Sequence, residues 1–390
     1  MTAATLIRGV SVWDGERLLD ADGLRLAGGR ITHVGRGLRP QPDDRLVDGG
    51  GAFALPGLID AHVHLELDPA QSAPPAADAP RDLDAMSARA GAMVRAGITT
   101  ARDLGGGQGA ELILRDRIAA GTVPGPRLLC AGQPVTTPGG HCHFWGGEAA
   151  DLDAARAVID RQLARGVDLI KVMATGGMFT RGSHPAAAQF DLDTLTGIVA
   201  AAAAADRPVA AHCHGVDGIE FAARAGVRTI EHCSWMGADG WAGNYDEAIA
   251  GVILSRGAWV SPTVNRGWQR YLDAPDPTKL RRIRSAFQAM MALGIPFVAS
   301  TDAGIPGVRH DELAQALEVF RAILETTPET VLRTATSAAA QGIGLESVTG
   351  RLAPGMAADL LLVDGDPLQD LAALTRPVAV WAAGRLRRSP

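Results

Sequence analysis

The architecture of this chain is set by the segment Leu55-Pro56-Gly57-Leu58-Ile59-Asp60-Ala61-His62-Val63-His64. A short apolar run leads directly into two histidines, His62 and His64, spaced two residues apart. On a β-strand this spacing puts both imidazoles on one face, whereas on a helix they point in roughly opposite directions. Two neutral imidazoles at a strand end form half of a metal site, although the pair is also compatible with two solvated histidines.

Similar apolar runs recur along the chain, and patterns typical of helices separate them. The predicted strands are Ala54–Ile59, Ile98–Leu104, Arg127–Ala131, Leu169–Ala174, Pro208–His212, Thr229–His232, Trp259–Thr263 and Pro296–Thr301. Continuous apolar runs are expected for parallel strands buried on both faces, and eight strand–helix units predict an α/β fold of the (β/α)8 TIM-barrel type. An open doubly wound sheet is the alternative, but no Gly-x-Gly-x-x-Gly follows the first run.

Both ends of the chain look different from its middle. Residues 1–55 and 350–390 contain short strand-like runs separated by glycine and proline turns, and each end is too short to bury a core alone. We therefore expect a small β-sandwich built from residues 1–55 plus 350–390, and a catalytic barrel from residues 56–349. The arginines near the end, between 385 and 388, are predicted to lie in a frayed, solvated tail.

Composition excludes several classes of function. The 390 residues are 47% hydrophobic and 21% charged, which is ordinary for a globular protein. The net charge is −6 and no basic cluster is present, so we expect no nucleic-acid partner. The start lacks the apolar core of a signal peptide, and no apolar segment reaches the ~18 residues of a membrane span. These features predict a cytoplasmic protein without a membrane partner.

The four cysteines do not form a disulfide framework or a Cys-x-x-Cys pair. Three of them adjoin a histidine, which raises the question of thiolate ligands. If His212 and His214 face a site from one strand, however, Cys213 between them faces away. The same holds for Cys233 after His232, so we expect buried, unreactive thiols.

Side chains suited to metal binding follow four of the predicted strands. They are His62 and His64 after the first, His212 and His214 after the fifth, His232 after the sixth, and Asp302 after the eighth. In a barrel enzyme the catalytic residues lie at the carboxyl ends of the strands. Packing alone does not readily explain why four of these ends carry side chains of the kind that bind metals.

Lysine usage adds to this pattern, because only Lys171 and Lys279 are lysine among 37 basic residues. Lys171 lies inside the apolar run Leu169–Ala174, where an ammonium group is costly to bury unless it is paired or chemically altered. A neutral amine reacts with CO2 to give a carbamate, an anionic ligand that can bridge two cations. An ordinary Lys–Asp ion pair is the alternative.

Together these motifs resemble the amidohydrolase superfamily, in its imidazolonepropionase-like and Xaa-Pro dipeptidase-like branch; ochratoxin-hydrolysing enzymes are similar. The resemblance covers nearly the whole chain. It rests on Pro56–His64, Thr99–Asp103, Gly139–His141, Lys171–Gly177, His212, Ile230–His232, Thr301–Gly304 and Gly355–Leu360.

The resemblance implies two divalent metal ions, commonly Zn2+. By this analogy His62, His64 and Asp302 hold one ion, His212 and His232 hold the other, and CO2-carboxylated Lys171 bridges both together with a hydroxide. Two cations lower the pKa of a bridging water and polarise a carbonyl group. As the catalytic proton shuttle, Asp302 would take the proton of the attacking water and deliver it to the leaving nitrogen.

Four further residues are candidates for substrate binding: His141, His214, Arg181 and Trp235. Arginine suits a substrate carboxylate because it donates two parallel hydrogen bonds. Trp235 stands where dipeptidase-like relatives carry a tyrosine that helps to bind that carboxylate. With Trp145, Trp241 and Trp268, which are also expected in loops, it predicts a pocket for a bulky or aromatic group. The roles of His143 and His184 stay open.

The predicted function is therefore metal-dependent hydrolysis of a C–N amide bond in a small molecule, a dipeptide or an N-acyl amino acid, by a homo-oligomeric enzyme. Hydrolysis of a cyclic amide, as in imidazolonepropionase, is one alternative. A lactone or a phosphotriester is another, since the same hydroxide attacks any polarised electrophile. A metal-free barrel used only for binding is the alternative outside catalysis.

Overall fold

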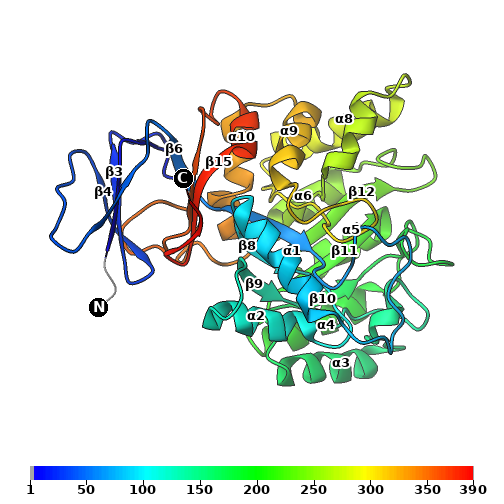
Figure 1. Ribbon diagram of the computed structural model, residues 1–390. Coiled ribbons are helices and arrows are strands. Elements are labelled where there is room, and N and C mark those ends of the chain that lie inside the picture. The colour runs from blue at the N-terminus through cyan, green and yellow to red at the C-terminus, as the bar shows by residue number, and fades with distance from the viewer. Residues whose placement is uncertain (1–3, 390) are drawn as a thin grey trace.

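The computed structural model describes residues 4–389 and has an α/β fold, with parallel strands and helices alternating through the middle of the chain (Figure 1). One parallel sheet contains β7 (Leu58–Val63), β8 (Ile98–Asp103) and β9 (Arg127–Cys130). A second contains β10 (Ile170–Met173), β11 (Val209–Gly215), β12 (Thr229–Met236) and β13 (Trp259–Ser261).

Backbone hydrogen bonds connect the two sheets at both edges. Between β9 and β10, Val135 donates to Lys171 O and accepts from Met173, each at 2.8 Å. At the other edge residues 296–302 lie between β13 and β7. There Val260 donates to Pro296 O at 2.9 Å, and Asp302 donates to His62 O at 2.9 Å. The carboxyl ends of strands from both sheets are thereby brought to one end of the molecule.

Two of the predicted strands are corrected by the structure. Pro296–Thr301 forms only an isolated bridge, at Phe297, because its backbone divides its bonds between β13, β7 and Thr334 O. The run Ala54–Ile59 divides at Gly57, where a Cβ atom would lie 2.0 Å from the Thr99 hydroxyl. The residues before this glycine form β6 (Phe53–Pro56), which belongs to a different sheet from β7.

Helices follow most of these strands and pack on their outer side. The longer ones are α1 (Leu83–Arg95), α2 (Ala110–Ala120), α3 (Leu152–Ala164), α4 (Leu192–Ala203), α5 (Val216–Ala225), α6 (Glu247–Ser255), α8 (Thr278–Ala292) and α9 (Leu313–Leu324). Shorter ones are α7 (Gln269–Leu272), α10 (Pro328–Thr334), α11 (Ser337–Gly342), η1 (His143–Trp145), η2 (Arg266–Trp268) and η3 (Leu371–Thr375). Asp151 and Asp191 cap α3 and α4 by accepting from backbone N–H groups, as helix-starting aspartates do.

The chain ends form two further sheets, which lie beside the helical part in Figure 1. One sheet has the order β4-β3-β1-β5, from Arg30–Gly35, Gly23–Ala27, Thr5–Arg8 and Arg45–Asp48. The other has the order β16-β15-β14-β6-β2, from Arg385–Arg388, Pro377–Ala382, Leu360–Val363, Phe53–Pro56 and Ser11–Val12. Strands from both ends of the chain share one hydrophobic cluster that includes Ile7, Leu24, Leu360 and Trp381.

The terminal arginines are therefore not a frayed tail, because β16 pairs antiparallel with β15 and its backbone has partners there. Across residues 4–389, no helix combines the length and apolar character that crossing a membrane requires.

Candidate metal centre

Three of the predicted ligands meet where β7 ends. His62 Nε2 lies 3.3 Å from His64 Nε2 and 3.3 Å from Asp302 Oδ1, and His64 Nε2 lies 3.4 Å from the same oxygen. Ligand atoms about 2.1 Å from a common tetrahedral ion are about 3.4 Å apart. The three atoms thus have the mutual spacing of ligands around one zinc-sized ion.

A second group comes from the ends of β11 and β12. The ligand nitrogens of His212, His214 and His232 lie within 4.8 Å of one another, and all three side chains are buried. His214 therefore lies together with His212 and His232, the two ligands predicted for the second ion. Its ring stacks on that of His232, with 4.5 Å between the ring centres.

Lys171 on β10 is buried among these side chains, with 1% of its surface exposed. Its Nζ atom has no hydrogen-bond partner, and the lysine forms no ion pair within the described chain, 4–389, so the predicted Lys–Asp alternative is not observed. Burial lowers the pKa of this amine. A buried amine without a hydrogen-bond partner, near both histidine groups, fits the carbamate ligand that the sequence suggests.

In three imidazoles of the centre, the ring nitrogen that faces away from the other ligands donates to a hydrogen-bond acceptor, and this fixes the tautomer. A fourth, His62, is described below. His64 Nδ1 donates to Gly105 O at 3.2 Å, and His212 Nε2 donates to Gly176 O at 3.0 Å. His232 Nδ1 donates to Thr263 Oγ1 at 2.7 Å, because that hydroxyl gives its own proton to Pro262 O. Each ring therefore turns an unprotonated nitrogen inward, as a metal ligand must.

The fourth imidazole is held by a buried network that the sequence analysis missed. Glu231 Oε2 accepts from His62 Nδ1 at 3.0 Å, and Glu231 Oε1 accepts from Arg102 Nη2 at 2.8 Å. Arg102 also donates to Ala61 O at 2.7 Å. A charged residue inside an apolar strand was the available signal, the same one that singled out Lys171.

Burial lowers the pKa of four imidazoles of the centre, those of His62, His212, His214 and His232. Together with the charge of Lys171, it lowers the pKa of His62 to about 4 and that of His214 to about 3. Burial also raises the pKa of Asp302, but the surrounding histidines outweigh it, so the net direction is downward. Neutral imidazoles beside an ionised carboxylate are the protonation states that a cation requires.

The backbone is strained around the same side chains. His232, Cys233, Trp235, Thr263 and Asp302 all have positive φ, between 48° and 65°. Non-glycine residues seldom adopt this conformation, and it concentrates at functional sites where the surrounding structure enforces it.

His141 also reaches the centre, with its ring 4.5 Å from that of His212 and its Nδ1 3.1 Å from Thr180 Oγ1. Gly177 permits this approach, because a Cβ atom there would lie 2.4 Å from His141 Nε2. The side chains of Arg181 and His184 are exposed on the loop after β10, unlike the buried side chains of the centre. His143 is half-buried in η1 and bonds to Gly140 O.

The tryptophans take three different positions. Trp145 packs against His64 and donates to Glu66 Oε1 at 2.8 Å. Trp235 lies on β12 rather than in the predicted loop, and it is fully buried against Tyr245. Trp241 and Trp268 are half-buried, and the Trp241 ring lies 4.8 Å from that of His214.

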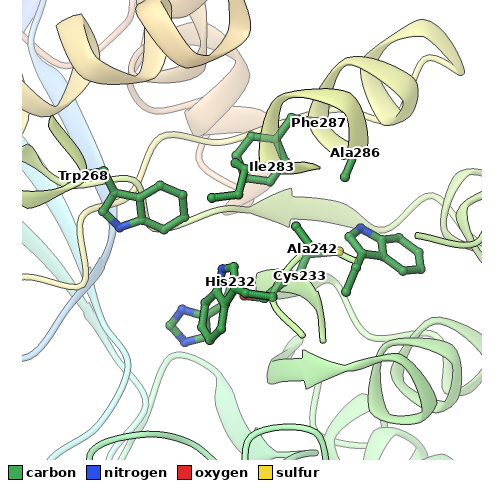
Figure 2. Close-up of a pocket in the computed structure, with 10 residues that line it drawn as sticks. His232, Cys233, Ala242, Trp268, Ile283, Ala286 and Phe287 are labelled. Atoms are coloured by element: carbon green, nitrogen blue, oxygen red, sulfur yellow. The ribbon is translucent and has the colours of Figure 1, made fainter. Parts of the chain in front are cut away.

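A small apolar pocket lies beside these tryptophans. Ile283, Ala286 and Phe287 of α8 lie on one side of it, and His232 and Cys233 lie opposite (Figure 2). Trp235, Trp241 and Trp268 also line it. Its free space is about 10 Å3, room for a single water molecule. The pocket in this form is too small for a bulky group.

The four cysteines are free and buried, as expected. Burial raises the pKa of Cys213 and of Cys233, which leaves both as unreactive thiols next to His212, His214 and His232.

Comparison with known proteins gives a consistent result. Residues 53–387 match the model of the family described as the amidohydrolase family. The chain is 29% identical to ochratoxinase of Aspergillus niger over 382 residues, which cover 86% of this chain and 76% of that protein.

Two solved structures are similar over their full length. One is a prolidase complexed with N-methylphosphonate-L-proline, with a TM-score of 0.85, 26% identity, and coverage of 99% of this chain and 100% of that one. The other is a putative prolidase from Bifidobacterium longum, with a TM-score of 0.80, 26% identity, and coverage of 100% and 96%. With a family match over most of its length and these relatives, the chain belongs to the amidohydrolase family and is a hydrolase acting on C–N bonds.

Proposed function

We propose that this protein is a binuclear metal-dependent hydrolase that cleaves the amide bond of a dipeptide or an N-acyl amino acid. The observation that carries the proposal is the spacing of His62 Nε2, His64 Nε2 and Asp302 Oδ1, each 3.3–3.4 Å from the other two. We also propose that residues 56–349 form a (β/α)8 barrel, and that residues 1–55 plus 350–390 form a separate β-sandwich.

The donor set fits two ions. His62, His64 and Asp302 would hold one, and His212 and His232 the other, with carboxylated Lys171 between them. Zinc is the metal that best suits imidazole and carboxylate ligands in this number. When bound, the ions would lower the pKa of a water molecule and polarise the amide carbonyl group.

The side chains themselves have separate tasks. Asp302 keeps an ionised carboxylate at the end of residues 296–302, where it can accept the proton of the attacking water and pass it to the leaving nitrogen. The rings of His214 and His141 both pack against that of His212, where they can orient the substrate carbonyl. The hydroxyl of Ser234, 2.9 Å from His214 Nδ1, fits either tautomer of that ring.

The substrate class is supported by the relatives. Ochratoxinase and a prolidase bound to a proline derivative are similar to this chain over most of its length, which favours an amide formed with an amino acid. We further propose that the enzyme is a homo-oligomer, which size-exclusion chromatography with light scattering would show.

The test combines metal analysis with a substrate screen. The purified protein is incubated with zinc and bicarbonate, its metal content is measured by mass spectrometry, and dipeptides and N-acyl amino acids are assayed for release of the free amino acid. We expect about two equivalents of metal and turnover of at least one substrate. A sample that holds well under one equivalent and stays inert would favour a metal-free binding protein.

A further inference from the structure

A group of positive charges without a counter-ion lies next to the tryptophans of the site. Arg270 Nη2 donates to Tyr271 Oη at 2.9 Å, and Lys279 Nζ donates to the same oxygen at 3.1 Å. The guanidinium carbon and the ammonium nitrogen also lie 4.7 and 4.5 Å from the centre of the phenol ring. Arg270, Tyr271 and Lys279 are termed the Tyr271 cluster.

No carboxylate neutralises the Tyr271 cluster. Within the described part of the chain, residues 4–389, neither of its cations has a carboxylate within ion-pair distance. The acidic residues of the same segment are bound elsewhere: Asp273 accepts from Gln269 at 2.9 Å and Asp276 from the backbone N–H of Thr278 at 2.9 Å.

The two cations also affect the pKa of Tyr271, whose phenol oxygen accepts a hydrogen bond from each of them. Burial raises the pKa of Tyr271, but the hydrogen bonds and charges of Arg270 and Lys279 outweigh burial and lower it overall. Because the oxygen accepts from both cations, its own proton is directed elsewhere, and no acceptor for it is found within residues 4–389. A guanidinium, an ammonium and a hydroxyl donor are thus gathered at one place.

Aromatic rings join the Tyr271 cluster to the metal centre. The Trp241 ring contacts both the His214 ring, at 4.8 Å, and Lys279 Nζ, at 5.1 Å. The Trp268 ring lies 5.5 Å from that of Tyr271 and lines the pocket beside His232 (Figure 2). A substrate whose amide lies at the histidines and whose body lies along these rings would present its far end to the Tyr271 cluster.

We propose that the Tyr271 cluster binds a carboxylate of the substrate, so that this enzyme selects amides that carry a negative charge. The inference rests on the proposed function, since it assigns the specificity of that same site. Arginine and lysine form charge-assisted hydrogen bonds with carboxylates, and half-buried Lys279 is screened less by salt than an exposed cation. Two aromatic rings also hold Lys279 in place, which reduces the entropy lost on binding. Arg181, unlike half-buried Lys279, is exposed on a loop.

The test compares N-benzoylglycine with its methyl ester, following benzoate release from the amide bond by chromatography on zinc-loaded protein. We expect Lys279→Met to lower the acid-to-ester ratio of kcat/KM about tenfold, mostly through KM of the acid. Lys279→Arg should restore most of the ratio, and Arg270→Met should lower it less because Arg270 is exposed. Arg281→Met, an exposed arginine on the same helix, is the matched control, and thermal melting confirms that each variant is folded.

An equal loss for acid and ester in Lys279→Met would overturn the inference, as would a collapse of the ratio in Arg181→Met instead. Calorimetric titration with the acid gives a readout that does not need turnover. Binding by the wild type that Lys279→Met weakens about tenfold, without hydrolysis of either compound or of any dipeptide or N-acyl amino acid in the screen, would keep the Tyr271 cluster and refute the proposed hydrolysis. Equal binding by both proteins would refute the cluster alone.

Discussion

Glu231 Oε2 lies 3.0 Å from His62 Nδ1, and both side chains are almost fully buried. The carboxylate keeps the proton of His62 on Nδ1 and leaves the lone pair of Nε2 directed at His64 and Asp302. Arg102 and Thr229 both donate to the other carboxylate oxygen, which fixes Glu231 in turn. The tautomer of a ligand from β7 is thus decided by side chains of β8 and β12.

Replacing Glu231 by glutamine should reverse that tautomer. The single amide oxygen of glutamine would stay with Arg102, so its NH2 group would donate to His62 Nδ1 and move the ring proton to Nε2. We expect zinc affinity to fall about 10- to 100-fold, as measured by competition with a chelator. Nitrogen NMR shifts of labelled histidine in the metal-free protein report the tautomer directly.

The matched control for that variant is Glu220→Gln, which removes a surface carboxylate from its pair with Arg224. Its zinc affinity should equal that of the wild type. An unchanged tautomer and unchanged zinc affinity in Glu231→Gln would contradict the role of the network.

Lys171→Ala should remove the bridging ligand and with it at least one equivalent of metal. The cavity left by this buried side chain can admit a small carboxylic acid, so acetate or propionate should restore part of the activity. Metal content and turnover are measured with and without the acid. Full metal content in the variant without any added acid would argue against a carboxylated lysine.

Asp302→Asn should lower kcat by about 10²- to 10⁴-fold, because an amide cannot accept the proton that the carboxylate takes up. The asparagine is nearly isosteric, so the melting temperature should change little. Steady-state kinetics and thermal melting are the two measurements. Near-normal kcat in a folded variant would exclude Asp302 as the proton shuttle.

Glu111 makes stability depend on pH. Its carboxyl group is fully buried without a hydrogen-bond partner, and burial, with the charge of Asp103, raises its pKa to about 8. The native state therefore binds a proton that the unfolded chain, with a pKa of 4.5, releases. The stabilisation is complete below pH 4.5 and is lost as pH rises to about 8, by an amount on the order of a few kcal/mol.

Glu111→Gln removes that titration, so the melting temperature of the variant should fall less between pH 5 and pH 8 than that of the wild type. Glu329→Gln, at a half-exposed surface pair, serves as the control. Parallel pH profiles for Glu111→Gln and the wild type would show that Glu111 is ionised or hydrated in the fold.

Two tryptophans should respond differently to truncation. Trp235→Ala removes a fully buried ring and should lower the free energy of unfolding by about 3–5 kcal/mol. Trp241→Ala opens the half-buried wall beside His214 and should change KM for apolar substrates with a smaller loss of stability. Denaturant unfolding and KM across small and large substrates test both. A change in KM confined to Trp235→Ala would assign the substrate contact to that ring instead.

The sequence was sufficient for features that depend on local spacing. The His62–His64 pair stands out because two histidines follow an apolar run at a spacing of two residues. Lys171 stands out because it places a charged side chain inside an apolar run. The division at Gly57 was not predictable, since it depends on Asp359 O and the Thr99 side chain, which are distant in the chain. The irregular course of residues 296–302 likewise depends on bonds to three other segments.

Within the site, ligand identities were easier to predict than the groups that hold them. Arg102 and Glu231 are 129 positions apart, on strands of two different sheets, so their contact appears only in three dimensions. Tyr271 lies in α7 and Lys279 in α8, and nothing in the spacing of these two helices along the sequence predicts that Lys279 and Arg270 converge on one phenol oxygen.

The irregularity of residues 296–302 has a consequence for how such an enzyme can change. Ala299, three positions before Asp302, donates its N–H to Thr334 O at the end of α10, a helix that supplies none of the candidate ligands. Substitutions in that helix can therefore shift the proton-accepting oxygen by small amounts while every ligand is kept. The chemistry of the centre can be adjusted from the back of the molecule.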